Sequence, residues 1–162
     1  MDAQPLGTPL WDFSIAVYGG DGVEGECLDL QERYGLDVNV LLLAAYAGVV
    51  EGVRLTAADF AAANATVAGW QADVVRPLRQ ARRGLKGKNA ETLRSQVKAS
   101  ETEAEKTEQV LLWQWSRRHL AASAPGDRAD ALAANLRVVL DYVGAAGAAL
   151  LHLQKAASAY RR

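Results

Sequence analysis

The most constraining feature of this sequence is the apolar stretch VNVLLLAAYAGVV at residues 38–50. It contains no charged side chain and only one amide, Asn39. A helix needs about 20 apolar residues to span a bilayer, and this stretch is shorter than that. We therefore expect it to form a helix at the centre of a core, with the other helices packed around it.

The rest of the sequence also has helical periodicity, and no segment shows the sustained apolar–polar alternation of a half-buried strand. Pro77 is expected to kink the fourth helix near residues 74–76, because proline removes a helical hydrogen bond. One final helix is predicted after its cap Asp127, with an apolar face that extends from Leu132 to Leu153. The predicted N-caps are Thr8, Asp21, Asp37, Asn89 and Asp127.

These patterns predict an all-α fold. We expect a loose arm at residues 1–8 and a single helical domain at residues 9–162. The domain is predicted to be a bundle of about six helices. Three short helices surround the buried central helix, and a longer polar helical hairpin follows it. The middle of the helix after Asn89 has small or polar residues in its stripe, so it is expected to bury little surface.

Composition excludes few classes of function. The chain has 162 residues, ordinary hydrophobic content and a net charge of −1, so any electrostatic argument must be local. Its single cysteine, Cys27, cannot form an internal disulfide and falls in an apolar row, which predicts an inert core thiol. The first residues lack the basic and apolar regions of a signal peptide, and we expect a cytoplasmic protein.

The strongest local anomaly is a run of cationic side chains within VRPLRQARRGLKGK, with no acid between them. Four of them recur at i, i+3, i+4 and i+7 and form one ridge on a helix. Arginine forks suit phosphate and carboxylate oxygens. The candidate partner- or anion-binding residues of this basic ridge are Arg76, Arg79, Arg82, Arg83 and Lys86.

The basic ridge also has a purely structural interpretation. The next predicted helix carries acidic residues that an antiparallel hairpin would bring opposite the arginines, namely Glu101, Glu103, Glu105 and Glu108. Charge runs are usually solvated surface, which favours this interpretation narrowly. The acids could in principle bind a metal, but the region has no histidine, so no metal is predicted.

A second candidate site is a small polar pocket near the start of the central helix. Asp37 and Asn39 would line it together with Asp12 and Gln31. The alternative is a structural role, in which Asp37 caps the helix and Asn39 makes a buried hydrogen bond. The sequence contains no recognisable catalytic or cofactor motif, so no catalytic residue and no cofactor are predicted.

The chain resembles a family of short proteobacterial proteins classified as a domain of unknown function. The resemblance covers most of residues 10–98, and it implies a bacterial, cytoplasmic protein with no assigned activity. The motifs that carry it are Trp11 with Phe13, Cys27-Leu28 with Leu30-Gln31, Gly35 with Asp37-Val38-Asn39, and Trp70 with the Arg79–Lys86 run.

Three functions follow as hypotheses. The first is a non-enzymatic adaptor or regulator that binds a protein partner through the basic ridge. The second is a binder of an anionic ligand, such as a nucleotide, nucleic acid or acidic lipid, through the same ridge. The third is an enzyme with a polar pocket formed by Asp12, Asp37 and Asn39. A homodimer is a further prediction, through the polar hairpin or through a close-packing surface at Gly144 and Gly147.

Overall fold

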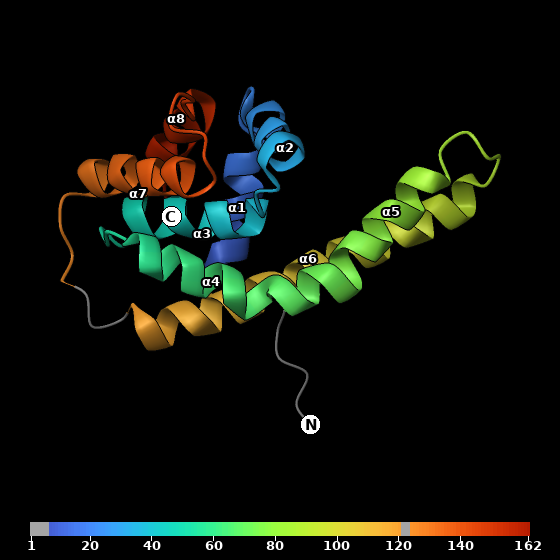
Figure 1. Ribbon diagram of the computed structural model, residues 1–162, viewed down its shortest axis with the longest axis horizontal. Coiled ribbons are helices and arrows are strands. Elements are labelled where there is room, and N and C mark those ends of the chain that lie inside the picture. Colours follow the sequence, from blue (N-terminus) through green and yellow to red (C-terminus); the bar gives the residue numbers. More distant parts are fainter. Residues whose placement is uncertain (1–6, 121–123) are drawn as a thin grey trace.

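The structure is a computed structural model that describes residues 7–120 and 124–162, and its regular elements are all helical (Figure 1). The all-α prediction is confirmed. Of the predicted arm at residues 1–8, residues 1–6 lie outside the described part. The elements are α1 (Pro9–Tyr18), α2 (Val23–Tyr34), α3 (Val38–Val49), α4 (Ala57–Trp70), the π-helical segment η1 (Gln71–Val75), α5 (Arg76–Gly84), α6 (Glu91–His119), α7 (Arg128–Tyr142) and α8 (Leu151–Ala159).

The apolar stretch forms the central helix α3, as predicted. Every residue from Val40 to Gly48 is buried. Helix α3 packs most extensively against α7, and it also contacts α1, α2, α4, α6 and α8. A Cβ atom added to Gly48 would lie 2.6 Å from the Leu132 Cα atom of α7. Glycine at this position therefore permits the close approach of the two helix backbones.

Three of the predicted N-caps are confirmed. The side chains of Thr8, Asp37 and Asp127 each accept a hydrogen bond from a backbone N–H in the first turn of α1, α3 and α7. The predictions for Asp21 and Asn89 are wrong. Gly22 precedes α2 with a positive φ of 75°, which suits glycine, and Asn89 itself has a φ of 56° in the turn before α6.

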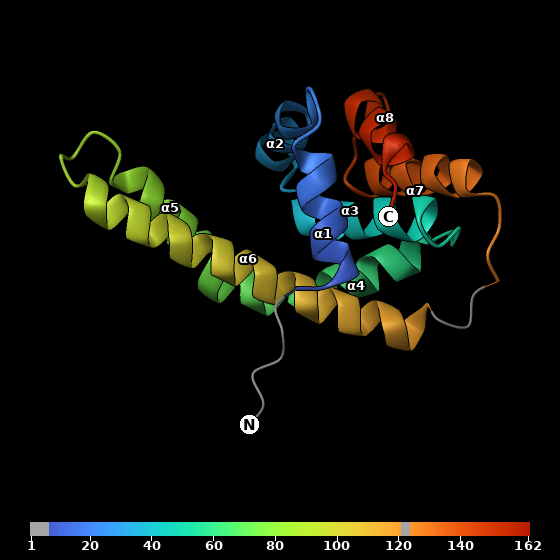
Figure 2. The same ribbon diagram turned by 180° about the vertical axis from the view of Figure 1, so that it is seen from behind.

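A long helical hairpin extends away from the other helices in both views (Figures 1 and 2). Its first arm consists of η1 and α5, which continue α4 without a break, and its second arm is the N-terminal part of α6. The π-helical turn at residues 71–75 lies directly before Pro77, which has no N–H to donate to the carbonyl of residue 73. We call residues 71–105 the hairpin and the other described residues the body.

The prediction of one final helix is wrong, because the chain breaks it into α7 and α8. Gly144 has a φ of 81°, in the left-handed region, and α8 begins only at Leu151. The Glu26 carboxylate caps α8 by accepting hydrogen bonds from the backbone N–H groups of His152 and Leu153, each at 2.9 Å. Gly144 and Gly147 thus lie in a turn and do not form the helical close-packing surface that was predicted.

The core draws on every helix except α5, which has no buried residue. Cys27 is fully buried in it, and burial raises the pKa of its thiol to about 12, as expected for an inert core cysteine. Within residues 7–120 and 124–162, no helix is long and apolar enough to cross a membrane.

Candidate functional site

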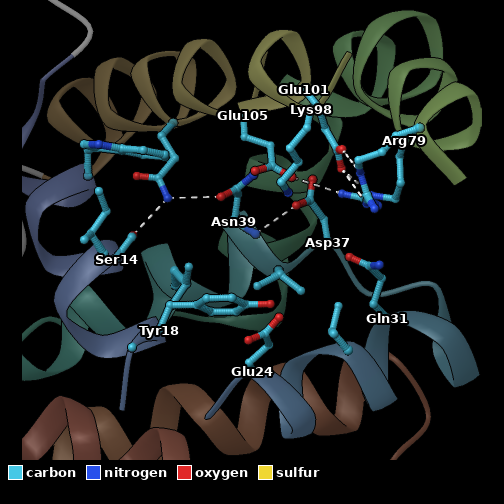
Figure 3. A pocket seen from close by; sticks show the side chains of 18 of the residues that line it. Ser14, Tyr18, Glu24, Gln31, Asp37, Asn39, Arg79, Lys98, Glu101 and Glu105 are labelled. Carbon is cyan, nitrogen blue, oxygen red and sulfur yellow. Dashed lines mark hydrogen bonds and ion pairs between the residues drawn. The ribbon is translucent and has the colours of Figure 1, made fainter. Parts of the chain in front are cut away.

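A cleft of about 630 Å³ lies between the body and the hairpin (Figure 3). One wall consists of α1, α2 and the start of α3, and the other consists of α5 and α6. Figure 3 shows Glu101 and Glu105 on the α6 wall, with Tyr18 and Glu24 on the wall opposite. The cleft combines charged groups with an apolar lining of Trp11, Ile15, Tyr18, Leu28, Val38 and Leu42.

Two arginines of the basic ridge, Arg79 and Arg82, converge on one buried carboxylate, Glu101. Arg79 Nε lies 3.3 Å from Glu101 Oε1, and Arg82 donates to both carboxylate oxygens, with Nη2 at 3.2 Å from Oε1. Arg79 Nη2 also lies 3.3 Å from Glu105 Oε1. The Glu101 side chain is only 2% exposed, so the two arginines compensate a charge that water hardly reaches.

The arginines determine the charge state of Glu101. Burial alone would raise the pKa of this carboxyl, but the hydrogen bonds and charges of Arg82 and Arg79, with the charge of Lys98, outweigh burial and lower the pKa. The opposite holds for Glu105, whose pKa is raised by burial and by the neighbouring Glu101 charge. Glu101 is therefore the ionised centre of this network.

The rest of the basic ridge is less constrained. Arg83 points to α2 instead of α6, with Nη2 at 3.8 Å from Glu32 Oε1, and both side chains are more than half exposed. Arg76 and Lys86 are exposed and make no ion pair with any residue in the described ranges. The structure thus divides the predicted ridge into a partly buried part that is paired with α6 and an exposed part.

The predicted polar pocket is brought together only in part. Gln31, Asp37 and Asn39 line the cleft, whereas Asp12 is exposed and is not among its lining residues. The enzyme hypothesis relied on Asp12 beside Asp37 and Asn39, so it loses one of its three groups. Asp37 Oδ1 accepts the backbone N–H of Asn39 at 2.9 Å, which is the capping role.

Asn39 is the centre of a buried hydrogen-bond network that joins four helices. Its amide nitrogen donates to Glu108 Oε2 at 3.1 Å, and its amide oxygen accepts from Gln109 Nε2 at 3.0 Å. Gln109 also donates to the Ser14 hydroxyl at 2.9 Å, and Gln71 donates to Glu108 Oε2 at 2.7 Å. The network therefore fixes α1, α3, η1 and α6 relative to one another.

Asp37 and Glu108 form a carboxyl pair within this network. The two groups are within hydrogen-bonding reach of each other, and Glu108 is fully buried. Burial, followed by contact with Asp37, raises the pKa of Glu108. Asp37 Oδ2 and Glu108 Oε1 have no other donor among the described residues. A proton on Glu108, donated to Asp37 Oδ2, would satisfy both oxygens.

Sequence reasoning missed Glu108, Gln109 and Gln71 as partners of the Asn39 region. It assigned Glu108 as a counter-ion of the arginines, and the structure instead turns Glu108 towards Asp37. Glu103 was assigned likewise, but it pairs with Lys106 on its own helix at 3.4 Å. The missed signal is the spacing of residues 101, 104, 108, 112 and 115, which share the buried face of α6.

A family model described as a protein of unknown function (DUF2390) matches residues 9–112. The chain belongs to this family. The family expected from the motifs at Trp11, Cys27 and Asp37 is therefore confirmed. The DUF2390 region contains the whole hairpin, the Asp37–Glu108 pair and all the residues that line the cleft. It excludes α7 and α8. No curated protein and no solved structure matches the chain.

The chemistry of the DUF2390 region follows from these contacts. Among the residues that the structure describes, no group of three or more His, Cys, Asp or Glu side chains could hold a metal ion. The Asn39 network fixes the helices relative to one another, and the ion pairs of Glu101 join α5 to α6 within the hairpin. The exposed lining of the cleft is what remains for contact with another molecule.

Proposed function

We propose that this DUF2390 protein is a non-enzymatic adaptor or regulator, and that the cleft between the body and the hairpin binds a segment of a partner protein. The observation that carries the proposal is the exposed apolar lining of a preformed cleft, with Ile15 58% exposed on its α1 wall. Its volume lies within the range of about 300–1,000 Å³ that is typical of binding pockets.

The charges of the cleft favour a protein segment over a small anion. Four cationic side chains line it, and four acidic ones offset them: Arg79, Arg82, Arg83 and Lys98 against Glu24, Asp37, Glu101 and Glu105. An anion that captured Arg79 and Arg82 would displace Glu101 and leave that carboxylate buried without a partner, which is costly. The anion hypothesis is therefore weaker at this part of the basic ridge.

The lining also defines the partner segment. Its apolar anchor would pack on Ile15, Trp11 and Leu28, where aliphatic and indole surface is available. Polar groups flanking the anchor would meet charges of both signs, so the segment would be amphipathic without a strong net charge. Arg83, with its long and exposed contact to Glu32, is the ridge residue best placed to exchange partners. The proposal includes the cytoplasmic location that the unpaired Cys27 favours.

The test uses a matched pair of exposed aliphatic residues. Ile15 lies in the cleft, whereas Leu151 is 68% exposed on α8 and does not line it. A photo-crosslinking residue at position 15, introduced in cells that naturally express the protein, should trap one specific polypeptide that the same probe at position 151 does not. Ile15→Glu should then weaken binding of that purified polypeptide by about tenfold or more, as for a central interface residue. Leu151→Glu should leave it unchanged.

Several results would contradict the proposal. Equal crosslinking from positions 15 and 151, or equal affinity of the two glutamate variants, would show that the cleft is not the interface. A crosslinked product with the mass of two copies of this chain would identify the occupant as a second copy and replace the proposed partner. Light scattering of the purified protein would then verify the homodimer.

A further inference from the structure

The far end of the hairpin carries a concentration of positive charge, most of which lies outside the cleft. We call residues 84–98 the basic tip. It contains four cationic side chains, Lys86, Lys88, Arg94 and Lys98, and one acidic side chain, Glu91. The full chain has a net charge of −1, so this segment differs sharply from the rest of the molecule.

These charges are available to another molecule, unlike those of Arg79 and Arg82. Lys86, Lys88 and Lys98 are exposed, and none of them forms an ion pair within the described part of the chain. Glu91 offsets only Arg94, at 3.6 Å. Lys98 is the one member that also lines the cleft.

The local backbone presents two of the lysines in a compact turn. Gly87 has a φ of 74° and Asn89 a φ of 56°, and the chain reverses direction between the end of α5 at Gly84 and the start of α6 at Glu91. Lys88 N–H donates to the Leu85 carbonyl at 3.1 Å, which closes the turn. Figures 1 and 2 show this turn at the end of the hairpin, away from the body and open to solvent.

We infer that the basic tip binds the phosphodiester backbone of a nucleic acid. Phosphate contacts are made by Lys and Arg and also by neutral donors such as Asn, Ser, Thr and Gln. The exposed neutral side chains between the cations are of this type, namely Asn89, Thr92, Ser95 and Gln96. Binding of this kind needs neither base recognition nor a pocket.

The composition of the tip favours nucleic acid over an acidic membrane surface. Helices that lie on membranes have a broad apolar face and often an aromatic residue at the interface. The basic tip contains no aromatic residue, and Leu93, 49% exposed, is its one exposed large apolar side chain. The inference is independent of the proposed partner in the cleft.

The test measures binding of the full chain to fluorescently labelled single-stranded DNA, duplex DNA and single-stranded RNA at about 50 mM and about 200 mM salt. The variant Lys86→Gln/Lys88→Gln/Lys98→Gln removes three exposed charges, and Lys155→Gln on α8 is a matched control for an exposed lysine. We expect the triple variant to bind at least about tenfold more weakly at the lower salt concentration. The slope of the logarithm of its binding constant against the logarithm of the salt concentration should be smaller in magnitude by about 2. Each lost phosphate contact lowers that slope by about 0.7–0.9.

Each outcome decides the inference. Binding of any of the three nucleic acids that the triple variant loses and Lys155→Gln retains supports it, and the preferred arm identifies DNA or RNA as the source of the phosphates. No binding at the lower salt concentration overturns it, as does binding that the triple variant retains. The inference would also be overturned if the protein sedimented with phosphatidylserine vesicles and did not bind nucleic acid. Ile15→Glu should have no effect on nucleic-acid binding, so failure of the cleft proposal remains distinguishable.

Discussion

The body and the hairpin are both helical, but different forces hold them together. Helix α3 of the body buries every residue from Val40 to Gly48, whereas α5 of the hairpin buries none. The body therefore gains its stability from apolar burial, at about 25 cal/mol per Å². In the hairpin, ion pairs join α5 to α6, from Arg79 to Glu101 and Glu105 and from Arg82 to Glu101.

The comparison shows that helical periodicity alone does not determine how a helix is stabilised. Helical spacing places Leu41 of α3 among apolar neighbours. It places Glu101 of α6 beside the two guanidinium groups of Arg79 and Arg82. The two regions should therefore respond differently to a change in packing and to a change in charge. Three substitutions test this difference.

The largest effect is expected from Gly48→Ala in the body. The added Cβ would lie 2.6 Å from Leu132 Cα, and backbone atoms of α7 cannot move aside as a flexible side chain would. Overpacking of this kind costs about 3 kcal/mol of the free energy of unfolding. Denaturant titration monitored by circular dichroism would measure the loss.

Gly69→Ala in α4 is the matched control. No atom lies within 4 Å of the position of its added Cβ, and the residue is exposed in the helix. Alanine should stabilise the protein there by up to about 1 kcal/mol through helix propensity. Equal stabilities of the two variants would show that the α3–α7 contact is not as close as described.

Glu101→Gln should have an intermediate effect, confined to the hairpin. It keeps the shape of the side chain and removes the charge that Arg79 and Arg82 share. Those arginine side chains are 18% and 21% exposed, so solvent would compensate only part of the loss, and we expect a cost of about 2 kcal/mol. The backbone amides of α5 should exchange with deuterium faster, while those of α3 keep their protection.

The control for this charge change is Glu103→Gln, two residues along the same helix. Glu103 is 57% exposed and pairs only with Lys106, so its loss should change exchange in neither helix. If Glu101→Gln accelerated exchange equally in α3 and α5, the hairpin and the body would unfold as one unit. The division drawn here between them would then be wrong.

The body was the easier region to predict from sequence. An uninterrupted apolar stretch as long as residues 38–50 favours a buried helix over a strand, and Asp37 marked its start. The antiparallel hairpin and its acidic counter-ions were also predicted, since Glu101 and Glu105 fall opposite Arg79. These features depend on local spacing, which the sequence records directly.

The missed features depend on contacts between distant segments. Glu26 ends the turn before α8 from a position more than 120 residues earlier in the chain, and no local pattern indicates where that helix begins. The rotation of α6 about its axis was also missed. Its middle was expected to bury little, yet Glu101, Glu108 and Gln109 are each at most 1% exposed. Polar residues escape a search for apolar stripes even when they occupy the buried face.

The smallest effect is expected where the two regions meet, at the Asp37–Glu108 pair. The folded protein keeps a proton on Glu108 because burial and contact with Asp37 raise the pKa of this carboxyl, whereas the unfolded chain releases it above about pH 4.3. The folded state therefore binds more protons than the unfolded state above that pH. The contribution of Glu108 to the free energy of unfolding is therefore greatest below about pH 4.3. It falls as the pH rises towards the pKa of Glu108 in the folded protein.

Glu108→Gln should remove this pH dependence. A glutamine amide reproduces the protonated acid, because its oxygen accepts from Asn39 and Gln71 while its nitrogen donates to Asp37. At pH 7 the variant should be more stable than the wild type by about 1 kcal/mol. The gain is no larger because solvent reorganisation already lowers part of the cost of the buried pair in the wild type. Denaturant titrations from pH 5 to pH 8 would measure it, with Glu103→Gln expected to follow the wild-type profile. A variant that is less stable than the wild type at pH 7, or that keeps the wild-type slope, would mean that Glu108 is ionised in the folded protein.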